Sequence, residues 1–477
     1  MTITLSDLGK AVLETEYAVR GPIVARAQEI ERQGRRVIYC NIGNPQALKQ
    51  RPLTFLRQFL SLAEYPELLD HPEVLKLYPQ DIVDRVRMFL RRHPPGTGAY
   101  TQSPGLPFVR QAVADFIEGR DGIPARKESI VLTDGASKGA QAVIMALLRT
   151  ATEGFLAPVP QYPLYSATVT LYGGSLLGYQ LDEENGWQVN ESALEGAVAR
   201  GKADGISPVL IVVINPGNPT GAVLSVENIK MVVRFAKRHG LAIVADEVYQ
   251  ENVYTREARY HSFARVMHDM GEYDVSLFTL HSVSKGFLGE CGHRGGYMEI
   301  RNVPDNVLAE FIKQQSISLC ANVTGQLATY LMVAPPQSGD PSYPLYVQER
   351  DAVLASLKAK AEILGRGINR IPGMSLVEPH GAMYAFVRFE LPPEPGVNPD
   401  AMNADERLAY ESGRDNEYCL RLLEETGICV VPGSGFGQRP GTFHFRTTFL
   451  PPKEEIEGLV ESLKSFHEKY THELAAT

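Results

Sequence analysis

The chain has 477 residues, 44% of them hydrophobic and 22% charged, and a formal net charge of −9 at neutral pH. This length exceeds what one hydrophobic core covers, so two or more domains are expected. The acidic balance, without a dense Lys/Arg block, argues against a nucleic-acid partner.

The N-terminus, the apolar runs and the cysteines indicate the cellular compartment, and the histidines bear on metal binding. The N-terminus shows neither a secretory signal nor an Arg-rich transit pattern. No run of about 18 apolar residues occurs, so no membrane partner is expected. The five cysteines are scattered without a C-x-x-C pair, which indicates reduced thiols and a cytoplasmic location. The histidines show no ligand spacing, so we expect no metal.

Short apolar runs alternate with helical stretches from about residue 120 to 300. Runs that are apolar throughout are typical of strands buried on both faces of a parallel sheet. The predicted strands are residues 129–135, 154–161, 208–215, 241–248 and 275–282, with helices that include 138–148 and 226–238. The alternation predicts an α/β fold, with a large domain in which a mostly parallel sheet lies between helices.

The pattern changes after about residue 345. A helix over 347–370 is predicted to precede strands at 382–389 and 442–449, with a helix from about 417 to 426 between them and a surface loop at 391–404. A smaller α+β domain fits this region. We therefore expect an N-terminal arm and part of the small domain in residues 1–90, the large domain in 91–345, and the C-terminal small domain in 346–477.

Polar residues follow several predicted strands, where ligands of open α/β sheets bind. The helix after the first strand would begin with free N–H groups of Ala136, Ser137 and Lys138 and the Ser137 hydroxyl, which suit a phosphate. An ordinary helix-capping turn is the alternative. Tyr162, after the second strand, is placed to stack on a flat ring, although a core tyrosine is the simpler interpretation.

The next two strand ends carry an amide and a carboxylate. The Asn215–Gly221 turn contains two Asn-Pro steps, which indicates either an aimed asparagine amide or turn chemistry alone. Asp246 follows five apolar residues, so its carboxylate is drawn toward a buried edge and needs a cation or donor. A protonated pyridine nitrogen or a structural salt bridge would supply it.

Lys285 lies among hydroxyl-bearing neighbours in Ser282–Gly286, and Arg294 follows nine residues later. A lysine amine can form a Schiff base with an aldehyde, and hydroxyls with a guanidinium suit a phosphate dianion. The cofactor that combines an aldehyde and a phosphate on one small ring is pyridoxal 5'-phosphate, although a solvated surface lysine is the plain alternative. Arg446, in an aromatic strand, needs a carboxylate from the protein or from a substrate.

Together these motifs resemble the class I/II aminotransferases, fold-type I pyridoxal-phosphate enzymes, and among them the alanine aminotransferases. The stretches NPGNPTG at 215–221 and SVSK at 282–285 are typical of the wider family. Two stretches, EYAVRGPIV at 16–24 and EETGICVVPGSGFGQR at 424–439, are typical of the alanine aminotransferases. The resemblance covers residues 12 to 470.

The resemblance implies a role for each site residue. Lys285 would hold the cofactor as an internal aldimine and later act as general base. Asp246 would pair with the pyridinium nitrogen, Asn218 and Tyr249 would bond the ring oxygen, and Tyr162 would stack on the ring.

The remaining implied roles concern the phosphate and the substrate. Arg446 would bind the substrate α-carboxylate, with Asn218 and Gly43 beside the substrate. The phosphate would be held by Ala136, Ser137, Lys138, Ser282 and Arg294, helped by Tyr100 from the other subunit of a homodimer.

The implied reaction is a ping-pong transamination, L-alanine + 2-oxoglutarate = pyruvate + L-glutamate. A glutamate/alanine–glyoxylate aminotransferase and a pyridoxal-phosphate lyase on the same fold are alternatives. A regulator that kept the fold would need a DNA-binding segment, for which the sequence has no spare residues. The chain departs from the family pattern at Asn44, Pro45 and His293, near the expected site.

Overall fold

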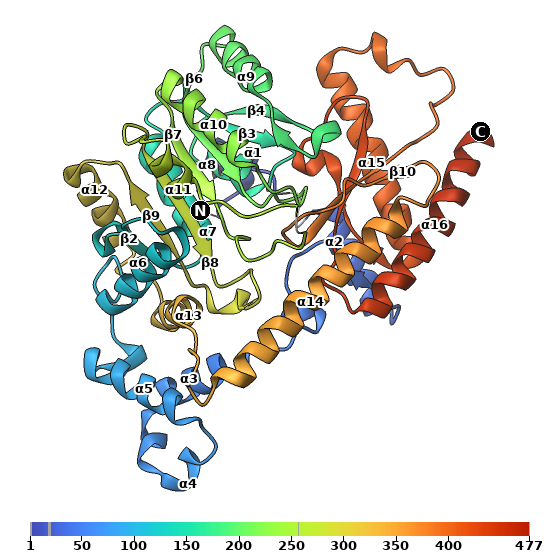
Figure 1. Ribbon diagram of the computed structural model, residues 1–477. Coiled ribbons are helices and arrows are strands. Elements are labelled where there is room, and N and C mark those ends of the chain that lie inside the picture. The colour runs from blue at the N-terminus through green and yellow to red at the C-terminus, as the bar shows by residue number, and fades with distance from the viewer. Residues whose placement is uncertain (1, 18–20, 256, 477) are drawn as a thin grey trace.

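The computed structural model describes residues 2–17, 21–255 and 257–476. A large eight-stranded sheet and a smaller four-stranded sheet lie on either side of the molecule, and the long helix α14 (Tyr343–Ile368) runs from one part to the other (Figure 1). Residues 18–20 of the EYAVRGPIV motif lie outside the described residues. No helix of the described part is long and apolar enough to cross a membrane.

The large sheet has the strand order β2-β9-β8-β7-β6-β3-β4-β5. Five neighbouring strands, from β8 to β4, run parallel, whereas β9 and β5 pair antiparallel with their neighbours. The strands are β2 (Ile130–Thr133), β3 (Glu153–Val159), β4 (Ser175–Asp182), β5 (Gln188–Val189), β6 (Ser207–Ile214), β7 (Ala242–Asp246), β8 (Leu277–Ser282) and β9 (Gly296–Arg301). The mostly parallel sheet and its five predicted strands are confirmed; β4, β5 and β9 were not predicted.

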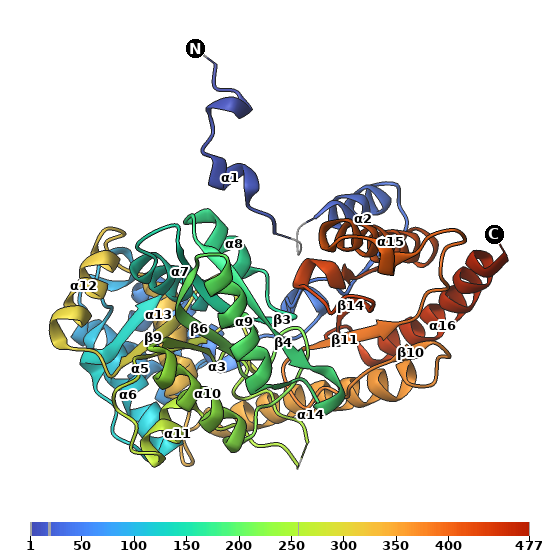
Figure 2. The same ribbon diagram turned by 90° about the horizontal axis from the view of Figure 1, so that it is seen from above.

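Helices cover both faces of this sheet (Figure 2). On β6, Leu210 and Val212 pack toward α7 (Ala136–Leu147), α8 (Leu164–Leu171) and α12 (Asp305–Ser316). Ile211 and Val213 pack on the opposite face, toward α9 (Glu191–Ala203), α10 (Val226–His239) and α11 (Phe263–Asp269). Successive side chains of a strand point to opposite faces, so a strand buried on both must be apolar throughout.

The smaller part is built on an antiparallel sheet of order β10-β11-β14-β13. Its strands are β10 (Met374–Ser375), β11 (Tyr384–Phe389), β13 (Val431–Pro432) and β14 (Phe443–Thr448). Strands β10, β11 and β14 share one hydrophobic core with α2 (Pro22–Arg32), α14, α15 (Ala404–Thr426) and α16 (Lys453–Ala476). The predicted α+β region is confirmed, but α15 begins well before residue 417. Asn403 and Glu406 cap its first turn reciprocally, a local signal that the prediction overlooked.

The first 90 residues divide between the two parts. Strand β1 (Ile38–Tyr39) pairs with β12 (Ile428–Cys429), and α1 (Lys10–Glu14) precedes it in the N-terminal arm. In contrast, α3 (Thr54–Glu64) and α5 (Gln80–Arg92), with the short α4 (Pro72–Leu75) between them, belong to the side of the large sheet. Their core includes α6 (Pro107–Asp121) and α13 (Val323–Val333). The division at residues 90 and 345 stays a prediction, and this packing favours a first boundary near residue 53.

Candidate active site

A cavity of about 410 Å³ lies where β7 and β8 end, and β11 and β14 of the smaller sheet close its other side. This volume is typical of a site for a small ligand. Eleven of the thirteen predicted site residues line it: Gly43, Ala136, Ser137, Tyr162, Asn218, Asp246, Tyr249, Ser282, Lys285, Arg294 and Arg446.

Two predicted residues lie elsewhere. The Lys138 side chain is exposed on the first turn of α7, and its N–H donates to the Gly135 carbonyl at 3.1 Å. Tyr100 is 76% exposed and does not line the cavity of its own chain.

One end of the cavity gathers donors around Arg294. Its Nη2 donates to Ser137 Oγ at 3.3 Å and its Nη1 to Ser284 Oγ at 3.4 Å. Gly135, with a φ of +87°, caps α7; a Cβ there would lie 2.6 Å from Arg294 Nη2. A guanidinium, two hydroxyls and a helix N-terminus therefore meet at one point, as a phosphate dianion requires.

Lys285 lies in the turn after β8. Its Nζ donates to the Gly43 carbonyl at 2.9 Å, and lies 5.9 Å from the centroid of the Tyr249 ring. The amine therefore faces the interior of the cavity and not solvent, which excludes the plain surface lysine.

Asp246 ends β7 and is buried. Its Oδ2 accepts a hydrogen bond from the Tyr165 hydroxyl at 2.7 Å, whereas its Oδ1 is buried without a partner among the described residues. Burial raises the pKa of this carboxyl to about 6. No basic side chain of the described part forms an ion pair with Asp246, so a structural salt bridge is not what holds it. A cationic donor inside the cavity would stabilise the carboxylate.

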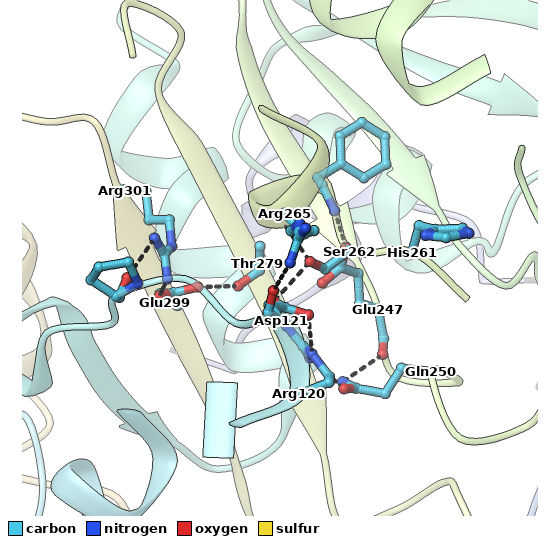
Figure 3. Close-up of polar contacts among 12 residues, drawn as sticks. Arg120, Asp121, Glu247, Gln250, His261, Ser262, Arg265, Thr279, Glu299 and Arg301 are labelled. Carbon is cyan, nitrogen blue, oxygen red and sulfur yellow. Dashed lines mark hydrogen bonds and ion pairs between the residues drawn. The ribbon is translucent and has the colours of Figure 1, made fainter. Parts of the chain in front are cut away.

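A network of polar side chains, which includes Glu247 directly after β7, connects this strand end to α6 and α11 (Figure 3). Glu247 accepts from the backbone N–H of Phe263 at 2.9 Å, and burial raises the pKa of its carboxyl to about 7. Nearby, Asp121 forms an ion pair with Arg120 and accepts from the Ser262 hydroxyl at 2.8 Å. These contacts tie α6 and α11 to the strand end and so help to fix the chain that carries Asp246.

Arg446 lies on β14 and is 1% exposed. Its guanidinium is held between two rings, 4.2 Å from the Tyr384 centroid and 4.6 Å from the Phe436 centroid. It donates to Asn218 Oδ1 at 3.2 Å and to the Asn41 carbonyl, while its Nε is buried without a partner in the described chain. No carboxylate of the described residues pairs with this guanidinium, so of the two partners that the sequence left open, the protein carboxylate is absent from the described chain.

The remaining predicted side chains face the same space. Asn218 follows β6 in a turn whose two Asn-Pro peptide bonds are cis. Tyr162 is half-buried at the cavity wall, and its hydroxyl shares a 2.8 Å hydrogen bond with Tyr17 of the N-terminal arm. Tyr162 is therefore not a core tyrosine.

Several residues of the site were not predicted, among them Tyr165, Ser284 and Tyr384. Tyr165 could have been predicted from the sequence, because it lies in the stretch QYPLY with Tyr162. Ser284 shares the SVSK motif with Lys285. Tyr384 carried no local signal, since its place depends on how β11 packs against residues far away in the chain.

The donor set fits pyridoxal 5'-phosphate. An amine in the cavity suits its aldehyde, the donors around Arg294 suit its phosphate, and the unpartnered Asp246 Oδ1 suits a protonated ring nitrogen. No group of three or more His, Cys, Asp or Glu side chains is placed to hold a metal ion within the described residues.

Known proteins share both the sequence and the fold. A relative from Dictyostelium discoideum, named "Probable alanine aminotransferase, mitochondrial", is 46% identical over 98% of this chain and 89% of its own. "Glutamate–glyoxylate aminotransferase 2" of Arabidopsis thaliana is 44% identical over 98% and 96%. The solved alanine aminotransferase of Pyrococcus furiosus superposes with a TM-score of 0.77 at 25% identity, over 97% of this chain and 100% of that one. Residues 72–463 match the family model "Aminotransferase class I and II". The chain belongs to the class I and II aminotransferases, enzymes that use pyridoxal 5'-phosphate to move amino groups between amino acids and 2-oxo acids.

Proposed function

We propose that the protein transfers the amino group of L-alanine to 2-oxoglutarate, with pyruvate and L-glutamate as products. The single observation that carries the site assignment is the buried Arg446 guanidinium, which has no carboxylate partner among the described residues and lines the same cavity as Lys285. A substrate α-carboxylate would supply the missing charge. The similarity to relatives named alanine aminotransferases supports alanine as the donor.

In this proposal the wall of the cavity holds the cofactor. When bound, pyridoxal 5'-phosphate supplies an aldehyde that captures amino groups and a ring that withdraws electrons. Lys285 is the amine for that aldehyde and Asp246 the partner of the ring nitrogen. Asn218 and Tyr249 would bond the ring oxygen, and Tyr162 would stack on the ring. The phosphate contacts would come from Ala136, Ser137, Ser282 and Arg294, whereas the Lys138 N–H, which the sequence predicted as a further donor, is already bonded to the Gly135 carbonyl.

The remaining roles concern the substrate. Arg446 orients the carboxylate, so that the Cα–H points toward Lys285. The Lys285 amine would then take the Cα proton as general base and give it back as general acid to the aldehyde carbon of the cofactor. Gly43 lines the space proposed for the substrate. A side chain at this position would fill part of that space, since even a Cβ would collide with the Tyr384 hydroxyl oxygen.

The two half-reactions would follow one another, and pyruvate would leave before 2-oxoglutarate binds. Glyoxylate as the acceptor is the second candidate, supported by the similarity to a glutamate–glyoxylate aminotransferase. A lyase on the same fold is the third, and it would release ammonia without needing an oxo acid.

We also propose a homodimer in which Tyr100 reaches the phosphate of the other subunit. Its 76% exposure in a single chain supports this assignment. The five free cysteines support a reducing compartment such as the cytoplasm. Relatives with mitochondrial names make the mitochondrion the alternative, and fractionation of the source cells would decide between them.

The test is a spectrum of the cofactor-loaded protein during stepwise addition of substrates. L-alanine should change the cofactor absorbance and release one pyruvate per site, and 2-oxoglutarate should restore the spectrum and release one glutamate. Glyoxylate in place of 2-oxoglutarate tests the second acceptor, and ammonia release tests the lyase. A spectrum that alanine leaves unchanged would refute alanine as the donor.

A further inference from the structure

Tyr384 contacts the site, yet none of the roles above uses its hydroxyl. It begins β11, is 3% exposed and lines the cavity. Its ring lies on the Arg446 guanidinium, at 4.2 Å from the ring centroid. The ring therefore has a packing role, which leaves the phenolic oxygen unexplained.

The hydroxyl lies beside the Lys285 amine. A Cβ built on Gly43 would collide with Tyr384 Oη and would lie 3.1 Å from Lys285 Nζ, so the oxygen and the nitrogen border the same point. The amine is also tied to this point, because it donates to the Gly43 carbonyl at 2.9 Å. The phenolic oxygen and the amine nitrogen therefore lie within about 5 Å of each other, close enough for proton transfer directly or through one water.

The groups around this phenol favour its ionised form. Lys285 and Arg446 are the cations that face it, and Tyr249 forms a hydrogen bond with it; Tyr162 and Cys291 are the other titratable groups nearby. Burial alone would raise the pKa of Tyr384, but the two cations and the Tyr249 bond bring it below its ordinary value of 10.0. The same burial raises the pKa of Tyr249, to which Tyr384 and Asp246 contribute further. The two neighbouring phenols therefore differ, because the surroundings of Tyr384 favour its phenolate form and those of Tyr249 favour the neutral phenol.

We propose that the Tyr384 hydroxyl is the proton partner of the Lys285 amine. Lys285 can take the Cα proton only after its ammonium form has lost one. In the proposed step an N–H bond of the ammonium breaks, an O–H bond forms on the Tyr384 phenolate, and no other reactant is consumed. This inference rests on the proposed function, in which Lys285 is the base.

The test compares Tyr384→Phe with the wild type and with Tyr254→Phe. Phenylalanine keeps the ring on Arg446 and removes only the oxygen. Tyr254 is a buried tyrosine of the same core whose hydroxyl donates to the Ala382 carbonyl at 2.6 Å, outside the cavity lining, so it controls for the loss of a buried phenol.

Two experiments are run against pH: one measures kcat and KM for alanine, and the other measures the ultraviolet absorbance of tyrosinate in the cofactor-free protein. Tyr384→Phe should lower kcat near neutral pH by about 100-fold, as the loss of a positioned proton-transfer group does, with recovery at alkaline pH and KM within about twofold. The variant should also lack the one tyrosine that ionises at a lower pH than the other tyrosines. Tyr254→Phe should retain both properties.

An unchanged pH profile or an unchanged tyrosinate titration in Tyr384→Phe would overturn the inference. The second variant is Lys285→Met in the cofactor-free protein, which removes a cation beside the phenol. In this variant the pH at which Tyr384 ionises should rise. A titration equal to that of the wild type overturns the inference as well. Because these titrations need no substrate, they decide the phenol–amine pairing even if alanine proves not to be the donor.

Discussion

Replacement of Arg446 by methionine separates a substrate-binding arginine from a structural one. Methionine is long and apolar, so it fills most of the space between Tyr384 and Phe436. Loss of a desolvated guanidinium–carboxylate pair costs about 2–5 kcal/mol. At about 1.36 kcal/mol per tenfold, kcat/KM for alanine should fall by about 30-fold to about 5,000-fold.

The effect of this change on stability should be small. The variant loses hydrogen bonds to Asn218 and Asn41, each worth about 1.5–3 kcal/mol when a charge takes part. It also removes a buried cation that no described carboxylate neutralises, and whose desolvation costs several kcal/mol. These two contributions oppose each other in the free energy of unfolding.

The assay pairs pyruvate formation with thermal unfolding, and Arg110→Met is the matched control. Arg110 is a buried arginine of α6 that donates to the carbonyls of Ile130 at 2.8 Å and Glu128 at 3.2 Å, outside the cavity. Because Arg110 is 9% exposed, against 1% for Arg446, a smaller desolvation cost offsets its lost hydrogen bonds, so its loss should lower stability by about 1–3 kcal/mol and leave KM for alanine unchanged. If Arg446→Met instead lowers stability like the control and keeps kcat/KM within about threefold, Arg446 is a structural residue.

Three other changes test the rest of the site. Lys285→Ala should still bind cofactor but stop turnover, as product assays would measure, and substantial remaining activity would contradict its role as base. Asp246→Asn should slow the chemical step in single-turnover absorbance; a change in cofactor affinity alone would make Asp246 only a binding residue. In the cofactor-free protein, folded Asp246 holds its proton up to pH about 6 and the unfolded chain only to about 3.8, so stability should fall as pH rises between these values. Asp246→Asn should flatten that part of the unfolding curve, and an equal slope in both proteins would contradict the raised pKa. Gly43→Ala should lower kcat/KM by about tenfold or more with normal folding, because the added methyl meets Tyr384 and Lys285 and displaces groups of the site. Gly119→Ala, on the exposed face of α6, is its control, since a Cβ there meets nothing within 4 Å.

Local sequence was sufficient for the elements that carry most of the site. Strands β6 and β7 are runs of buried apolar residues, and the polar residues that follow them can only lie at the strand ends. For that reason the sequence alone places Asn218, Asp246 and Lys285 at one edge of a sheet. The start of α15 was also encoded locally, in the reciprocal cap of Asn403 and Glu406.

The tertiary structure decided the pairings, because they join residues far apart in the chain. Sequence left open whether Arg446 pairs with a protein carboxylate, and only the packing of β14 between Tyr384 and Phe436 shows the guanidinium without one in the described chain. The bond from Tyr165 to Asp246 spans 81 positions, and the contact of Lys285 with Gly43 spans 242. No local pattern records such contacts, since they form only when separate segments pack together. The sequence therefore determined which chemical groups are present at the strand ends, and the packing of the two sheets determined which of those groups meet.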